Sequence, residues 1–296
     1  MKLVPIEKAS QIILWDTSNL ALRCFFQKGL MNLTRSDGYP VGHIHGVVMK
    51  LQAFVRDQIR GPTAMVFALD RYPAWKHALY ADYKRRTRTD FAKFIVNVEN
   101  VEEFHPVNDV ITLLSYIPCT MVYADGEESD DVMASLCAKY KDIPIRLISS
   151  DKDMWQLLRM PHVTIGEKDL VTESAVKEEF GLSLSETKKI ALYKAIRGDK
   201  SDNIPCIPYL FQKVKAAFYE CDGTPKDLLL KMPSGKHKDL LMDHAAQIKQ
   251  MYKLTKLNRK LSFEEKWYAG NSEYMQFFLR KFECVKVINK SNLFFL

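Results

Sequence analysis

The sequence predicts an α/β protein with a mainly parallel central sheet and helices on both of its faces, followed by a helical C-terminal region. Two observations predict this fold. Short apolar runs at 11–15, 64–69, 119–123 and 145–148 alternate with segments in which apolar residues recur at helical spacing. From about residue 182 onward these runs stop, and the pattern is mostly helical. Alternating strands and helices are typical of a parallel sheet that is covered on both faces.

The elements of the α/β part follow from this alternation. A buried strand at 11–15 precedes a helix at 17–27, and a helix at 42–59 ends at Gly61-Pro62 before the strand 64–69. The segment 80–93 is crowded with Lys, Arg and Tyr and has no apolar stripe. Further strands are expected at 119–123, 145–148 and 163–165, and helices at about 129–140 and through 155–158.

The C-terminal part is predicted to contain a helix from about 185 to 197 and two or three further helices between 212 and 252. We place a soft boundary near residue 185, with an α/β catalytic domain at 1–185 and a helical DNA-binding domain at 186–296. The two parts are expected to pack as one body. The last residues, 292–296, are expected to pack on the core rather than to form a partner-binding tail.

Composition limits the class of protein. The 296-residue chain is 47% hydrophobic and 27% charged, as globular proteins are, and 43 basic against 36 acidic residues give a net charge of +7. A basic surface suits a polyanionic partner, although solubility alone would also explain it. No apolar stretch approaches the ~18 residues of a membrane span, and the N-terminus is not a signal peptide. Six cysteines without a C-x-x-C pair indicate reduced thiols, so we expect a cytoplasmic protein with no membrane partner.

Carboxylates recur in five clusters, most of them just after an apolar run. Acids at the carboxyl ends of parallel strands meet at one edge of the sheet, where such folds bind ligands. That much negative charge requires neutralisation, and hard divalent cations with oxygen ligands provide it. The clusters are Asp16; Asp70; Glu128, Asp130 and Asp131; Asp151 and Asp153; and Asp199 and Asp202.

Each acid also has a structural interpretation. Asp16 is placed to cap a helix that starts at Thr17, and Asp130 and Asp131 suit the first turn of a helix. Asp151 and Asp153 suit an exposed loop. No cluster is specific by itself; the shared context of an acid after a strand, repeated in order, favours a metal site. Two divalent ions in such a site can activate water and stabilise a leaving oxygen in phosphodiester hydrolysis.

Three motifs resemble those of the 5′-nuclease family, which includes flap endonucleases, phage 5′→3′ exonucleases and the 5′-nuclease domain of bacterial DNA polymerases. Glu128-Ser-Asp-Asp131 resembles its E-x-D-D helix start. Asp151-Lys-Asp153-Met-Trp-Gln-Leu157 is similar to its D-K-D-x-x-Q-L segment. Gly198-Asp-Lys-Ser-Asp-Asn-Ile-Pro205 resembles G-D-x-S-D-N-I-P closely. The order and spacing of the motifs agree across roughly residues 11–215, and the family has a PIN-like fold.

The resemblance implies two metal-binding groups and a cofactor of two Mg²⁺ ions, for which Mn²⁺ is expected to substitute. The first group comprises Asp16, Asp70, Glu128 and Asp130, with Asp131 beside them. The second comprises Asp151, Asp153, Asp199 and Asp202. Glu127 does not fit the E-x-D-D register and is expected outside the metal site.

The basic segment resembles the family's Y-K-x-x-R element at the base of a helical arch, here at about 80–105. Lys84 would reach the scissile phosphate and Arg88 an adjacent oxygen, both neutralising charge that grows in the transition state. Tyr83 would stack on a terminal base. Arg85 and Arg86 would bind the nucleic acid. A solvated loop that contacts phosphates without specificity is the alternative.

One segment departs from the family pattern. After Asn-Ile-Pro the family has a glycine hairpin of a helix-turn-helix-type element that grips a duplex phosphate, often through a monovalent cation. Here Cys206, Tyr209 and Phe211 stand at the glycine positions, and their side chains disfavour close approach and positive φ. The pattern argues against a K⁺ site, and Lys213 and Lys215 are expected to hold the duplex instead.

These motifs predict a Mg²⁺-dependent 5′→3′ exonuclease and flap endonuclease that hydrolyses DNA, with RNA primers in RNA–DNA hybrids as a further substrate. The absence of a polymerase domain favours a stand-alone, monomeric phage-type enzyme in replication or repair. A single-strand-binding protein or another replication protein is the expected protein partner. The alternatives are a PIN-like ribonuclease and a catalytically retired nucleic-acid binder, which would be expected to have lost acids.

Overall fold

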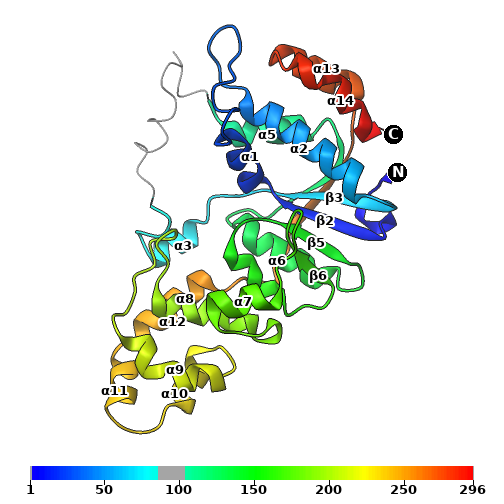
Figure 1. Cartoon of the computed structure of the whole chain (residues 1–296). Coiled ribbons are helices and arrows are strands. Elements are labelled where there is room, and N and C mark those ends of the chain that lie inside the picture. The colour runs from blue at the N-terminus through cyan, green and yellow to red at the C-terminus, as the bar shows by residue number, and fades with distance from the viewer. Residues whose placement is uncertain (1, 86–103, 296) are drawn as a thin grey trace.

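A seven-stranded, mostly parallel sheet forms the centre of the structure, a computed structural model that describes residues 2–85 and 104–295 (Figure 1). The strand order is β6-β5-β2-β3-β4-β7, with β1 paired to β3. All pairings are parallel except that of β4 with β7. The strands are β1 (Lys2–Leu3), β2 (Gln11–Asp16), β3 (Pro62–Ala68), β4 (Pro118–Tyr123), β5 (Ile145–Ile148), β6 (Val163–Ile165) and β7 (Glu264–Ala269).

The central strands are apolar on both faces because helices cover both. Along β2, Ile12 and Leu14 belong to one buried cluster, and Ile13 and Trp15 belong to the other. This alternation follows from the two-residue period of a strand. The predicted parallel sheet with two covered faces is confirmed.

Five helices of the described residues pack in the cluster on one face of the sheet and lie above it in Figure 1. Helices α6 to α12 pack in the other cluster, below the sheet. The first set is α1 (Thr17–Phe25), α2 (Gly42–Gln58), α5 (Pro106–Leu114), α13 (Ser272–Lys281) and α14 (Ile288–Ser291). The second set is α6 (Ser129–Lys139), α7 (Glu173–Phe180), α8 (Ile190–Arg197), α9 (Leu210–Glu220), α10 (Pro225–Lys231), α11 (Lys236–Asp243) and α12 (Ala245–Thr255).

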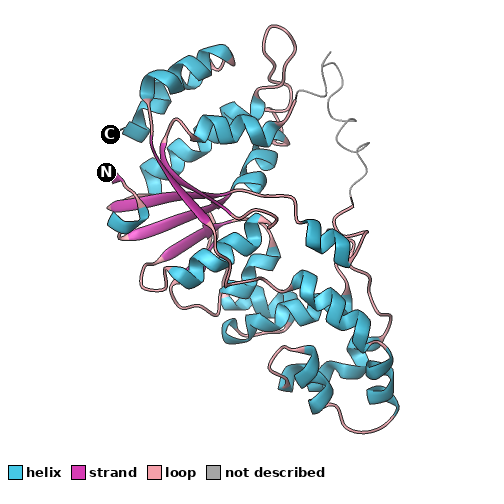
Figure 2. Cartoon of the chain, turned by 180° about the vertical axis from the view of Figure 1, so that it is seen from behind, coloured by secondary structure: helices cyan, strands magenta, loops and turns pink. Residues whose placement is uncertain are grey.

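Two expectations about the C-terminal part were wrong. Strands do not stop near residue 182, because β7 returns to the sheet and pairs antiparallel with β4 (Figure 2). Four helices, α9 to α12, stand where two or three were expected. The strand was missed because Glu264-Glu-Lys-Trp-Tyr-Ala269 is largely polar and its pairing partner lies far away in the sequence.

Short segments complete the fold. Helix α3 (Ala74–Leu79) precedes the basic segment, and 3₁₀ turns occupy Lys152–Leu157 (η2), where a helix was expected, and Leu184–Lys189 (η3). The expected packing of the C-terminal residues is confirmed, since Phe294 is buried in the core. All six cysteines are free thiols. The predicted arch lies largely outside the described residues, and no helix among the described residues is long and apolar enough to span a bilayer.

Candidate metal centre

The carboxyl ends of β2, β3, β4 and β5 bring the predicted acids to one edge of the sheet. Asp16 is the last residue of β2, and Asp70 follows β3 by two residues. Glu128 precedes helix α6 after β4, and Asp151 precedes η2 after β5. Because neighbouring parallel strands end at the same edge, sequence positions more than a hundred residues apart converge there.

Asp16 and Asp70 are held in place by helix starts. Asp16 does cap α1, as the structural interpretation proposed, because its Oδ1 accepts the amide of Asn19 at 3.0 Å. Its Oδ2 accepts Ser149 Oγ at 3.2 Å. Asp70 accepts the backbone amide of Ser129 at 2.9 Å and the hydroxyl of Ser18. Capping therefore fixes these carboxylates without removing them from the sheet edge.

The first group of acids carries mutually repelling charges. Burial, followed by the charge of Asp70, raises the pKa of Asp16 to about 7. Burial also raises the pKa of Asp130 well above its usual range, and the charges of Asp151, Asp16 and Asp70 add to this rise against the opposing effect of Lys84. Asp16 and Asp130 therefore share an electrostatic environment that disfavours their ionised forms.

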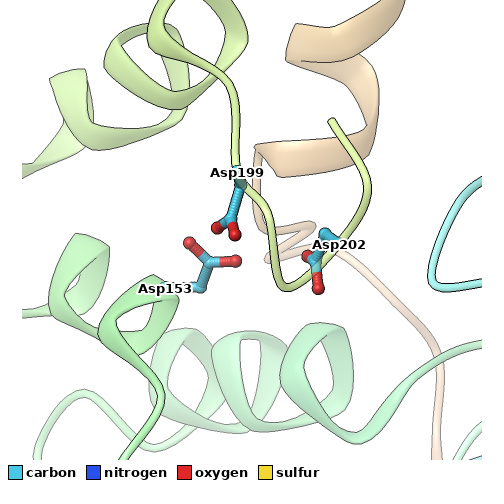
Figure 3. A group of neighbouring side chains, drawn as sticks. All are labelled: Asp153, Asp199 and Asp202. Carbon is cyan, nitrogen blue, oxygen red and sulfur yellow. The ribbon is translucent and has the colours of Figure 1, made fainter. Parts of the chain in front are cut away.

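The second group is a tight set of three carboxylates. Oxygens of Asp153, Asp199 and Asp202 lie within 4.8 Å of one another. Figure 3 shows Asp153 and Asp199 facing each other, with Asp202 beside them. Burial raises the pKa of Asp153 to about 7, against the opposing charge of Lys194, and burial also raises the pKa of Asp202. The charge of Asp151 raises the pKa values of Asp153 and Asp202 and also those of Asp16 and Asp130, so it acts on both groups.

Lys194 of α8 joins two members of the second group. Its ammonium group forms ion pairs with Asp153 and, at 2.7 Å, with Asp199. Burial opposes the ionisation of Asp199, but hydrogen bonds from Lys194 and Ser201 outweigh it and lower the pKa of Asp199. One lysine thus offsets part of the negative charge of this group.

Glu128 is the point at which the acids meet the basic segment. Its Oε1 accepts Lys84 Nζ at 2.8 Å. Its Oε2 accepts Tyr83 Oη at 2.9 Å and Lys76 Nζ at 2.5 Å. Burial opposes ionisation of Glu128, but Lys76 and Lys84 outweigh it and lower its pKa to about 2. Glu128 is therefore a charged anchor for Lys84 across the range of pH in which proteins work.

Asp131 lies next to this anchor but faces another direction. Its Oδ2 pairs with Lys76 Nζ at 2.7 Å, and its Oδ1 accepts the backbone amide of Asn258 at 2.7 Å. The side chain is 2% exposed. In this arrangement both of its oxygens hold the chain rather than face the other acids. A metal-binding role for Asp131 stays a prediction.

A tight turn presents Lys84 to the acids. Lys84 has a φ of 46°, in the left-handed region, and its amide donates to the carbonyl of Asp202 at 3.1 Å. The Asn203 side-chain amide donates to the carbonyls of Asp82 at 3.0 Å and Arg85 at 3.1 Å. Lys84 Nζ lies 4.0 Å from Asp202 Oδ1. The Asp199–Pro205 segment thereby fixes both the second group of acids and the lysine opposite them.

The expected role of Tyr83 does not agree with its position. Its ring is 2% exposed and packs in the core, and its hydroxyl donates to Glu128. A buried ring cannot stack on a terminal base, so Tyr83 instead supports Glu128.

The remaining predicted residues lie away from the acids or outside the described residues. Arg85 is exposed and pairs with Asp82 at 3.2 Å, whereas Arg86 and Arg88 fall outside the described residues. Lys213 and Lys215 are exposed on α9. The carboxylate of Glu127 accepts the indole N–H of Trp75 at 3.0 Å.

The segment that replaces the glycine hairpin adopts a partly unexpected conformation. Tyr209 has a φ of 61° although it carries a side chain, and it is 79% exposed. Phe211 is buried against Tyr193 and Phe218. Side chains were expected to disfavour a positive φ here, and Tyr209 adopts one nonetheless. Phe211 and Cys206 carry side chains at positions where the family has glycine, as expected from the sequence.

The donor set decides which cations fit the site. Every predicted ligand is a carboxylate, and hard divalent cations such as Mg²⁺ prefer oxygen ligands. The raised pKa values of Asp16 and Asp153 show that the pocket favours a loss of negative charge. A divalent cation would supply that neutralisation, so the residues fit such an ion.

Sequence reasoning missed three polar residues of the site: Lys76, Lys194 and Asn203. The two lysines are 3% and 9% exposed. Lys194 has a signal in the sequence, since it interrupts an apolar helix between Leu192 and Ala195. Lys76 has none, because α3 has no apolar stripe. Asn203 lies within a motif that was recognised, but its role depends on the position of the turn at 82–85.

A parallel sheet whose carboxyl edge gathers acids defines a broad class of proteins that bind ligands at that edge. Residues 11–181 match the family model described as the 5′-3′ exonuclease, N-terminal resolvase-like domain, which is more than half of the chain. The chain therefore belongs to the 5′-3′ exonuclease family, as its motifs predicted.

Relatives and solved structures agree with this assignment. The 5′-3′ exonuclease of Aquifex aeolicus is 28% identical over 261 residues, which cover 84% of this chain and 82% of the relative. Thermostable DNA polymerase I of Thermus aquaticus is 26% identical over 97% of this chain. The chain spans about a third of that polymerase, 34% of its length.

Two solved structures from bacteriophage T5 share the fold. The T5 5′-exonuclease with bound zinc ions has a TM-score of 0.60 at 15% identity and covers 96% of this chain and 98% of its own. A complex of the T5 flap endonuclease with DNA and metal ions has a TM-score of 0.59 at 15% identity, over 97% and 100% of the two chains. At this identity the likeness shows the fold.

Proposed function

We propose that this protein is a Mg²⁺-dependent 5′→3′ exonuclease and flap endonuclease that hydrolyses DNA by a two-metal mechanism. One observation carries the proposal: at one edge of the sheet, Lys84 contacts an acid of each group, Glu128 and Asp202. Membership of the exonuclease family supports the reaction class. The T5 relative bound to DNA and metal ions supports the type of substrate and cofactor.

In this proposal, Asp16, Asp70 and Asp130 hold one cation, and Asp153, Asp199 and Asp202 hold the other. Asp151 contributes to either group, because its charge acts on both. When bound, the two ions would supply activation of a water nucleophile and stabilisation of charge on the leaving oxygen. Mn²⁺ would substitute, since it accepts the same oxygen ligands.

The protein's own contribution centres on Lys84. Burial lowers the pKa of the Lys84 ammonium, but the charges of the neighbouring carboxylates outweigh it and raise the pKa. In decreasing order of effect, these carboxylates are Asp130, Asp202 and Glu128. The lysine therefore stays positive and, through Glu128 and the turn at 82–85, keeps a fixed position. A cation held there would stabilise the charge that grows on the scissile phosphate. Arg85, with Arg86 and Arg88, would contact the neighbouring phosphates.

Lys213 and Lys215 are proposed to contact the phosphates of duplex DNA. Both are exposed on one helix, and neither has an ion-pair partner within residues 2–85 and 104–295. They lie just after the segment that lacks the family's glycines, so a K⁺-mediated contact there is not part of the proposal. RNA–DNA hybrids are proposed as a second substrate, because phosphate contacts carry no sequence information.

A cleavage assay tests the proposal. A 5′-flap DNA and a single-stranded RNA of matching sequence are incubated with the protein, with and without Mg²⁺. We expect Mg²⁺-dependent release of the flap and of 5′-terminal products. An absence of metal-dependent cleavage of the DNA would refute the proposal, and cleavage restricted to the RNA would favour a PIN-like ribonuclease.

A further inference from the structure

A cavity of about 500 Å³ is lined by residues of α3, α6 and the end of α12, and by the chain that follows α12. Trp75 and Ala138 form part of its wall, and the segment 253–260, Lys-Leu-Thr-Lys-Leu-Asn-Arg-Lys, supplies most of the rest. This volume is in the range of sites that bind small organic groups. Asp131 also lines it and shares Lys76 with Glu128, so the cavity adjoins the metal centre.

The cations of this cavity are not neutralised. Lys253, Lys256, Arg259 and Lys260 are all exposed. None of their side chains forms an ion pair with a carboxylate of the described ranges. Lys256 lies over the ring of Tyr252 at 5.6 Å. Four unpaired cations along one short segment create a strongly positive surface.

A smaller cavity of about 180 Å³ continues this surface beyond Lys256 and Arg259. It adds Arg159 and Lys188, and it also contains one acid, Asp222, which accepts two hydrogen bonds from Thr224. Burial, followed by the charge of Arg259, lowers the pKa of Arg159. The two guanidinium groups therefore repel each other, and an anion between them would relieve that repulsion.

Trp75 gives the larger cavity an aromatic surface. The residue is 40% exposed, and its indole N–H donates to Glu127, which fixes the plane of the ring. Lys76 Nζ lies 5.5 Å from the ring centre. The same Lys76 pairs with Glu128 and Asp131, so Trp75 is one residue away from the network that anchors Lys84.

We propose that Trp75 and the cations of the segment 253–260 bind a single-stranded stretch of nucleic acid, with a base stacked on the indole and phosphates on the lysines and arginine. The inference rests on the proposed function in that it extends the same substrate. An aromatic platform beside unpaired cations is the combination that holds unpaired strands. An acidic peptide would use the cations but has no need of an exposed indole.

The test measures binding of a fluorescently labelled single-stranded thymidine oligonucleotide of about a dozen nucleotides. Chelator replaces divalent metal, so that cleavage does not contribute. Trp75→Ala is expected to weaken binding about fivefold or more, and Trp75→Phe to recover most of the loss because a stacking surface remains. The double variant Lys256→Ala/Arg259→Ala is expected to reduce the slope of log Kd against log salt by about 1.4, or 0.7 for each lost phosphate contact.

The matched control is Lys281→Ala/Lys286→Ala, which removes the same charge from exposed positions near the C-terminus. Equal effects of the two double variants, or an unchanged Kd for Trp75→Ala, would overturn the proposal. Flap cleavage with Mg²⁺ separates the two conclusions. If the unaltered protein cleaves the flap but the cavity variants bind the oligonucleotide as tightly as it does, only the inference fails. If the oligonucleotide needs the cavity but no flap is cleaved, only the proposed function fails.

Discussion

Three lysines of the metal centre each contact two carboxylates; Lys76 and Lys194 are buried, and the side chain of Lys84 is 28% exposed. Lys76 pairs with Glu128 and Asp131, Lys84 with Glu128 and Asp202, and Lys194 with Asp153 and Asp199. Three lysines offset only part of the charge of nine acids, so the pocket keeps a net negative charge in the folded protein. Removal of one partner from a buried ion pair costs about 3–5 kcal/mol, because the other charge stays uncompensated. These lysines therefore support the protein before any metal binds.

Lys84→Ala is expected to lower the single-turnover rate of flap cleavage by about a hundredfold, since it removes one preorganised positive charge from the transition state. Substrate affinity is expected to change much less. Single-turnover kinetics at saturating protein measures the rate, and a binding isotherm in chelator measures the affinity. Lys286→Ala, which removes a charge near the C-terminus, is the control. An unchanged rate would remove Lys84 from the reaction.

Stability without metal is expected to fall as pH rises from about 4 to about 7. Asp16 and Asp153 each have a pKa of about 7 in the folded protein, against 3.8 for the ordinary side chain. Between these values the folded state holds protons that the unfolded state has released, so rising pH favours unfolding. Thermal unfolding in chelator across this range measures the effect.

The same experiment with Mg²⁺ provides the control for this pH dependence. Protons compete with the cation for the carboxylates, so Mg²⁺ should raise the Tm more at pH 8 than at pH 5. Asp153→Asn removes one titrating group and should flatten the profile in chelator. A Tm that increases with pH up to 7, or an equal effect of Mg²⁺ at both pH values, would contradict the assignment.

At the scale of elements, the turn at 82–85 and the segment 199–205 act as one unit. The link is the Asn203 side chain, which donates to the carbonyls of Asp82 and Arg85. Asn203 itself has a φ of 57°, a conformation that glycine adopts without strain. Glycine at this position would therefore preserve the backbone and remove only the amide that orients Lys84.

Asn203→Gly is expected to reduce the single-turnover rate about tenfold while the binding of Mg²⁺ stays near that of the unaltered protein. A small error in the position of a catalytic group has such effects on rate. Calorimetry of Mg²⁺ binding and single-turnover cleavage are the two measurements. If metal affinity falls as much as the rate, Asn203 acts through the acids rather than through Lys84.

The elements that the sequence predicted are those with continuous apolar runs. The strands β2, β3, β4 and β5 are buried on both faces, so each is visible as an uninterrupted run. Polar β7 has no such signal. Helix α5 was not expected, and α13 lies in the part predicted to be mostly helical without having been placed by residue. In the site, most of the acids were predictable from their place after strands, whereas Asp199 and Asp202 follow helix α8 and were predictable from the motif at 198–205. The lysines Lys76 and Lys194 were not, because lysine is ordinarily exposed and only tertiary packing buries these two.

At the scale of the whole molecule, an acidic edge is set in a chain of net charge +7. In the proposed function, the positive charge outside the edge would attract the nucleic acid, and the acids would act on it once it has bound. Asp202→Asn is therefore expected to reduce turnover at least a hundredfold and to change DNA affinity less than threefold. Equal losses in both, by single-turnover kinetics and a DNA-binding isotherm, would contradict this division.

Strand β7 joins the part of the chain after residue 185 to the central sheet, so the predicted boundary there does not separate two independent folding units. A fragment 1–185 would lack the strand that covers β4, and it would leave six residues, Pro118 to Tyr123, as an open edge. Unpaired edges of this kind template association between chains. We expect such a fragment to aggregate, as light scattering would show, and to recover solubility when a chain containing 186–296 is co-expressed. A monodisperse, folded fragment would contradict this expectation. Residues 186–296 are thus expected to protect the sheet of residues 1–185 from association with other chains.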